Sequence, residues 1–357
     1  MSAPGLSPRQ QRADLHPRRL WAAMSTPGFM RKSAATCMVG LGLGVVSGGA
    51  VRLTGSGLGC KDWPNCTATS LVAPLQYHAW VEFGNRLVNV VITLGVLGVA
   101  LAALARRPRR RDLSWLAWGQ VAGMFAEIVL GGETVLHKLA PPFVMAHFLL
   151  AAALVIDAAA LFARSRKPDR LVSPGRAVPD RGRLLVRPGQ RRAARVMLGW
   201  SCVVVALGTV VTSTGPHAGA PGVPRFHFSL HTVAQLHGTS VELLLALTVL
   251  TMWSLYRSRT EASVMRKAEL VLLVMVAQAG VGYTQYLTGD PAALVAVHLA
   301  GATALLVSLV VFNMGLYAPP APGSSDVGGA SDPGVLAGLD AGEAPEHEAG
   351  TPALARL

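Results

Sequence analysis

The chain has 357 residues, of which 51% are hydrophobic and only 14% are charged. Soluble domains carry about 25% charged residues, so this composition excludes an ordinary soluble domain and favours a membrane protein. The formal net charge of +13 would suggest nucleic-acid binding in a soluble chain. Here the Arg and Lys residues cluster between apolar runs, so membrane orientation explains them better, and we expect no nucleic-acid partner.

Eight apolar runs are long enough to cross a bilayer as helices, because a span needs about 20 residues. In chain order, they cover residues 33–53, 78–105, 113–134, 142–163, 196–212, 229–255, 268–287 and 292–317. Arg and Lys concentrate before the first run and after the second, fourth and sixth. This alternation predicts a multi-pass protein of the cell membrane with both termini in the cytoplasm.

Residues 128–155 and 279–306 resemble each other at a constant offset of 151 residues, which relates Gly131 to Gly282 and His147 to His298. The repeat is four helices long, so both halves have the same orientation. We therefore expect an all-α polytopic membrane protein, with its eight transmembrane helices forming two pseudo-symmetric four-helix bundles.

The expected domains follow from these bundles. The N-terminal bundle covers residues 33–163 and the C-terminal bundle covers residues 196–317. Outside them we expect a cytoplasmic leader at 1–32, a basic cytoplasmic linker at 164–195 and a disordered cytoplasmic tail at 318–357.

Histidines near the outward ends of the helices are the main candidates for a functional site. From the helical rise, His237 and His298 lie about 9–12 Å below those ends. His147 lies at a similar depth in the first half, beside a helix that carries Glu82 and Asn85. Two imidazoles at matched depth on facing helices suit a haem with two axial histidines. A polar bridge between helices is the alternative, as is a zinc or copper site with further ligands.

Glu82 and Arg86 are four residues apart on one predicted helix, so an ion pair is the plain interpretation. The competing interpretation is a carboxylate that takes a proton or orients a substrate next to His147. Glu127 and Glu242 are further candidates with weaker context.

Cys60 and Cys66 lie in one outward loop, where a disulfide is allowed. A structural clip and a redox-active pair both fit the five intervening residues. The corresponding loop of the second half has no cysteine, which suggests that the first half does something the second does not.

Taken together and in order, several motifs resemble the haem A synthase family. They are RLTGSGLGCKDWPNC (52–66), VEFGNRL (81–87), LGGETV (130–135), GTVVTSTGPHAG (208–219), QLHG (235–238) and PAALVAVHLAGA (291–302). The resemblance covers residues 33–317. It implies an enzyme that oxidises a methyl group of haem O to a formyl group, by two hydroxylations and loss of water, to make haem A for cytochrome oxidase.

The resemblance also implies particular roles. A haem b cofactor would be held by His237 and His298, and the haem O substrate would lie in the first bundle. Glu82 and His147 would be catalytic, and His147 would bind the substrate and its metal together with the substrate-binding residues Asn85 and Arg86.

The same resemblance implies a disulfide between Cys60 and Cys66. Haem O synthase would supply the substrate, and membrane lipid would surround the helices. A homo-oligomer is left open.

Asn85 departs from the family, which has a histidine at this position. Since an amide is a poor iron ligand, either His147 alone holds the substrate iron and leaves a position for water or oxygen, or His78 substitutes. The runner-up function is a membrane di-haem cytochrome b that passes electrons from quinol to an outward acceptor. Asn85 speaks against it, because a second low-spin haem would lack a ligand.

Overall fold

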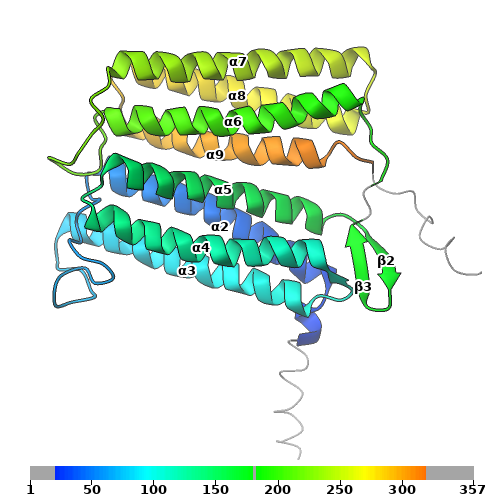
Figure 1. Ribbon diagram of the computed structural model, residues 1–357, viewed down its shortest axis with the longest axis horizontal. Helices are drawn as coiled ribbons and strands as arrows, with labels where there is room; N and C mark the ends of the chain where they lie inside the picture. Colours follow the sequence, from blue (N-terminus) through cyan, green and yellow to red (C-terminus); the bar gives the residue numbers. More distant parts are fainter. Residues whose placement is uncertain (1–20, 180–181, 319–357) are drawn as a thin grey trace, which may run out of the picture. The chain divides into compact units, whose positions relative to one another are not determined.

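The computed structural model describes residues 21–179 and 182–318 (Figure 1). Eight helices in this part of the chain are long and apolar enough to cross a membrane. They are α2 (Pro27–Leu53), α3 (Tyr77–Ala105), α4 (Arg111–Leu136), α5 (Pro141–Ser165), α6 (Pro188–Thr214), α7 (Leu230–Arg257), α8 (Ala262–Leu287) and α9 (Ala292–Met314). The eight-span helical prediction is confirmed. The first 20 residues of the predicted leader and the tail from residue 319 lie outside the described residues.

The helices contact one another in two closed cycles. In the first, α2 contacts α3, α3 contacts α4, α4 contacts α5, and α5 returns to α2; α6, α7, α8 and α9 make the same cycle in the second half. Between the halves, α9 contacts α2 and α5, and α5 contacts α6. The predicted site residues lie on α3 and α5, and on α7 and α9, which are opposite each other within a cycle. Side chains on these opposite helices can therefore meet in the middle of a cycle when they face inward.

The helices have two distinct ends. We call the end where α2, α4, α6 and α8 finish the disulfide end, and the end where α3, α5 and α7 finish the basic end. The two larger buried apolar clusters come from the middle and the basic half of each helix, and a third, smaller one (Cys60, Cys66, Ala73 and Ala79) lies under the disulfide loop. The larger members of the first two are Met30, Leu41, Leu113, Leu154 and Leu161 in the first cycle, and Met197, Leu244, Met275, Leu309 and Phe312 in the second. The dense core thus lies away from the predicted histidine sites.

The basic segment after α5 has more structure than its composition predicts. Strands β2 (Asp169–Ser173) and β3 (Arg176–Pro179) pair antiparallel, and β1 (Arg109–Arg110) pairs parallel with β3, giving the order β1-β3-β2. These strands are too short to show a periodic apolar pattern in the sequence.

Helices α2, α6 and α8 begin well before their predicted apolar runs, and α8 does so at Ala262 instead of 268. Helix α6 begins at Pro188 instead of 196, because proline suits the first turn and the Gln190 Oε1 atom accepts a hydrogen bond from the Arg187 N–H at 2.9 Å. Helix α2 begins at Pro27 instead of 33, with the Thr26 hydroxyl accepting from the Phe29 N–H at 3.1 Å. The first turns of α2 and α6 are polar, so hydropathy alone does not reveal where these helices begin.

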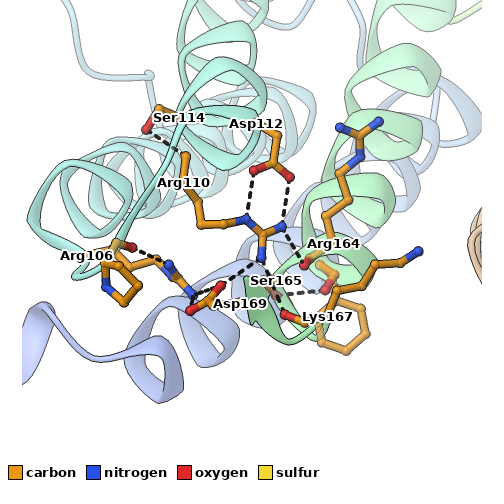
Figure 2. Close-up of polar contacts among 10 residues, drawn as sticks. Arg106, Arg110, Asp112, Ser114, Arg164, Ser165, Lys167 and Asp169 are labelled. Atoms are coloured by element: carbon orange, nitrogen blue, oxygen red, sulfur yellow. Dashed lines mark hydrogen bonds and ion pairs between the residues drawn. The ribbon is translucent and has the colours of Figure 1, made fainter. Parts of the chain in front are cut away.

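A buried charge network joins the α3–α4 turn to β2 (Figure 2). Asp169 accepts from the guanidinium of Arg106 at 2.7 Å and from that of Arg110 at 3.0 Å, and Arg110 also pairs with both oxygens of Asp112 at 2.8 Å. The two arginine side chains are only 2% and 0% exposed. Burial opposes the charge of Arg110, but the hydrogen bonds to Asp112 and Asp169 raise its pKa above the usual value. The network fixes the basic end of the first half.

Candidate functional site

Two histidines of the second half face each other. His237 on α7 and His298 on α9 have ring centroids 6.4 Å apart, with their planes inclined at 73°. Both residues are partly buried. The sequence-based pairing of these two side chains on opposite helices is therefore reproduced in the structure.

Each of these two rings packs against a neighbouring helix. The His237 Nδ1 atom lies 3.1 Å from the backbone carbonyl oxygen of Val204 on α6, and a Cβ atom added to Gly208 would lie 3.2 Å from the same ring. On α8, a Cβ atom added to Gly282 would lie 3.1 Å from the His298 ring. Glycine at these two positions lets each imidazole lie against a helix backbone. With its Nδ1–H donated to Val204, His237 keeps Nε2 free to bind a metal.

His147 on α5 has the same packing in the first half. A Cβ atom added to Gly131 on α4 would lie 3.2 Å from its ring. The Nδ1 atom of His147 lies 3.1 Å from an Oε1 oxygen of Glu127, also on α4. The carboxylate beside this histidine is therefore Glu127, which sequence reasoning ranked below Glu82. The 151-residue offset carries the missing signal, because it relates Glu127 to Gln278 just as it relates His147 to His298.

Asn85 makes its contact within the first half, toward α2. Its Oδ1 atom accepts a hydrogen bond from the Ser47 hydroxyl at 2.8 Å, and that hydroxyl also lies 3.1 Å from the carbonyl oxygen of Gly44. His78, the proposed substitute ligand, is exposed near the start of α3, and its Nδ1 atom lies 2.9 Å from the Ser56 hydroxyl. Each of these side chains thus has a polar partner in the first half.

Glu82 and Arg86 bind the disulfide loop. The structure contains the predicted disulfide between Cys60 and Cys66. Glu82 accepts a hydrogen bond from the Cys60 N–H at 2.9 Å and another from the Arg86 guanidinium at 2.8 Å. That guanidinium also donates to the carbonyl oxygens of Asp62, Pro64 and Asn65 at 3.0–3.1 Å. The ion-pair interpretation of Glu82 is what the structure shows, and the pair fixes the path of the loop.

The disulfide loop lies close to the His147 side of the first half. The ring of Trp63 packs on α4 so closely that a Cβ atom on Gly132 would lie 2.6 Å from it. The adjacent Gly131 contacts the His147 ring. Gly59 packs against the α3 backbone at His78, where any Cβ atom would overlap the carbonyl group. The loop therefore packs on α4 one residue away from the glycine that the His147 ring approaches.

Comparisons with known proteins agree over most of the chain. A family model described as "Cytochrome oxidase assembly protein" matches residues 32–310. A heme A synthase from Shewanella oneidensis is 25% identical over 315 residues, which cover 76% of this chain and 92% of that protein. One from Symbiobacterium thermophilum is 31% identical over 265 residues, covering 67% of this chain and 80% of that protein.

Some matches are shorter. A heme A synthase from Geobacillus kaustophilus is 31% identical over 127 residues, so the chain spans only 39% of that relative's length. The names of these relatives give no support to the runner-up interpretation, a di-haem cytochrome b. Because the family model spans most of the chain and the Symbiobacterium relative matches over four fifths of its own length, this chain belongs to the cytochrome oxidase assembly protein family.

Proposed function

We propose that this protein is a haem A synthase, which oxidises a methyl group of haem O to the formyl group of haem A. Family membership and the name shared by its relatives support this activity. The observation that carries the proposal is the facing pair of His237 and His298. When water supplies the oxygen atom, conversion of a methyl to a formyl group releases four electrons and four protons, so a resident redox cofactor suits the reaction.

The residues of the second half fit haem b. Bonds from a metal to an imidazole nitrogen are about 2 Å long, so two axial imidazoles on one iron have ring centroids about 6 Å apart. The observed separation of His237 and His298 is 6.4 Å. In the described residues, no group of three or more His, Cys, Asp or Glu side chains could hold a metal ion, which disfavours the zinc alternative. We therefore assign His237 and His298 to haem b, which would transfer electrons when bound.

The distribution of packing supports two porphyrin sites. The two larger buried apolar clusters come from the middle and the basic half of each helix, whereas His147, His237 and His298 lie in the half near the disulfide end. Glycines 131, 208 and 282 allow the Cε1 edge of each ring to approach the backbone of a neighbouring helix. We propose two four-helix bundles, each filled by side chains near the basic end and able to accept a porphyrin near the disulfide end.

In the first bundle we assign the haem O substrate to His147. Asn85 would lie beside the substrate without binding iron, since its amide is already paired with Ser47. Arg86 and the catalytic candidate Glu82 hold the loop over this site, and Glu82 is also the carboxylate that we expect to handle protons. The Cys60–Cys66 disulfide keeps the loop closed.

We place the protein in the cell membrane with its basic end and both termini in the cytoplasm, as the charge alternation predicts. The 164–195 segment would then be the cytoplasmic link between the bundles. Haem O is an amphiphilic product of another membrane-bound reaction, so haem O synthase is the partner that must supply it. The surrounding lipid would be its route.

The proposal can be tested by producing the chain with haem O synthase in a host that makes no haem A. Extracted pigments should contain haem A, and the purified chain should carry haem b. Haem O alone, extracted from a folded chain that carries haem b, would refute the activity. The variants His237→Ala and His298→Ala should lose haem b; retention of a full complement by both would refute the ligand assignment.

A further inference from the structure

A buried carboxylate lies against the histidine that we assign to the substrate. The Oε1 atom of Glu127 is 3.1 Å from Nδ1 of His147, and the Glu127 side chain is only 12% exposed. Among the described residues, neither Glu127 Oε2 nor His147 Nδ1 has an aligned hydrogen-bond partner, although the backbone of Glu127 also lies within reach of the His147 ring. A buried carboxylate without such a bond is costly, so its place beside the imidazole needs a reason.

The second half has a neutral side chain at the corresponding place. The 151-residue offset relates Glu127 to Gln278. Gln278 donates from its Nε2 atom to the backbone carbonyl oxygen of His298 at 2.6 Å, and the His298 Nδ1 atom has no hydrogen-bond partner among the described residues. Gly131 lies four residues after Glu127 on α4, and Gly282 lies four residues after Gln278 on α8. Each histidine packs against the corresponding glycine from the next helix. The two settings thus match in packing and differ in charge.

We propose that Glu127 is a positioning residue for His147, which gives the substrate half an axial ligand unlike that of the haem b half. The inference rests on the proposed function. Glu127 accepts the Nδ1–H of His147, fixes the tautomer and directs Nε2 toward the iron of the haem substrate. A histidine that donates to a carboxylate becomes a more basic ligand, with partial imidazolate character.

This difference fits the work that each half would do. A more basic ligand stabilises the oxidised iron and lowers its reduction potential, because it gives more electron density to the metal. Because the iron of the substrate haem would supply the oxidative chemistry, a ligand that favours its oxidised state would suit this half, whereas a haem that only passes electrons does not need one. Gln278 leaves His298 beside a neutral amide. Hydrogen bonds in unloaded sites are often poorly aligned, so the 3.1 Å contact is expected to become a hydrogen bond when Nε2 binds iron.

The test is spectroscopic and uses the full chain loaded with haem b and haem O. In Glu127→Gln, the iron–histidine stretching band of the ferrous substrate haem should move to lower frequency, and its midpoint potential should become more positive. The haem b potential should stay unchanged. The matched control is Glu242→Gln, which removes the same charge from an exposed carboxylate bound to the Tyr283 hydroxyl at 2.7 Å and should shift neither haem.

The possible outcomes separate this inference from the proposed function. A wild-type chain that binds no haem O would refute the proposed function. An E127Q chain that binds haem O with an unchanged stretching band and potential would refute only the role of Glu127. If E127Q does not accumulate with haem b, Glu127→Asp keeps the charge but withdraws the oxygen from Nδ1. Its band should then shift in the same direction, and an unshifted band would overturn the inference.

Discussion

Arg52 of the first half donates its Nε–H to the backbone carbonyl oxygen of His217 in the second half, at 2.6 Å. Its Nη2 atom donates to the carbonyl oxygen of Thr212 at 2.9 Å. The imidazole of His217 in turn lies 2.7 Å from the carbonyl oxygen of Asp290, in the turn before α9. One arginine of α2 therefore binds the last turn of α6 and the loop after it, and His217 extends this link to the turn before α9.

Arg52→Ala should lower the free energy of unfolding by about 3 kcal/mol, since two hydrogen bonds to a charged group are lost and two carbonyls remain unpaired. Denaturant or thermal unfolding of the purified chain in detergent measures the change. Arg225→Ala is the control, because Arg225 is exposed and donates within its own loop, to Pro216 at 3.1 Å. It should cost less than about 1 kcal/mol. Equal effects of the two variants would show that the link between the halves is dispensable.

Asp169→Asn should destabilise the protein by about 3–5 kcal/mol, because it removes the acid shared by two buried guanidinium groups. Arg106 would lose its only carboxylate contact given by the structure, and Arg110 would keep Asp112. Thermal unfolding reports the loss. Glu261→Gln, at an exposed helix cap without a side-chain hydrogen bond, removes a negative charge at the same end and should have little effect. A small effect of Asp169→Asn would mean that water or the backbone replaces the acid.

Gly208→Ala and Gly282→Ala should weaken haem b retention about tenfold, which corresponds to about 1.4 kcal/mol. The added methyl group would lie 3.1–3.2 Å from a histidine ring and displace it. The controls are Gly199→Ala on α6 and Gly280→Ala on α8, where a Cβ atom would meet nothing within 4 Å. These should keep haem b and gain helix stability of up to about 1 kcal/mol. Haem transfer to an acceptor protein gives the rates. Equal rates of haem loss in all four variants would show that His237 and His298 do not hold haem b.

Cys60→Ser combined with Cys66→Ser should speed tryptic cleavage after Lys61, because the short ring opens, at a stability cost of about 2 kcal/mol. Glu82→Gln should also speed cleavage, since the Cys60 N–H and the Arg86 guanidinium lose their shared acceptor. Gel analysis of timed digests follows the cut. Cleavage after Arg225, in the other exposed loop, is the internal control and should not change. A Lys61 bond that stays resistant in both variants would contradict the assigned role of Glu82 in holding the loop.

The sequence was most informative where the repeat and membrane physics act together. The apolar runs predicted all eight helices, and equal depth predicted that His237 and His298 would meet. The contact between Glu127 and His147 was not predicted, because helical rotation about the axis cannot be read from hydropathy when both faces are apolar. The pairing of Arg106 with Asp169 joins residues 63 positions apart through irregular backbone, for which no periodic signal exists.

Arg86 grips the disulfide loop through three main-chain oxygens. Hydrogen bonds to main-chain oxygens depend on the backbone path of the loop and do not depend on its side chains. Evolutionary drift can therefore replace Asp62 or Asn65 without loosening the cover above the first half. Low identity in this stretch is poor evidence that two homologues have diverged in architecture, and loops exchanged between them should graft successfully wherever the arginine and the two cysteines are kept.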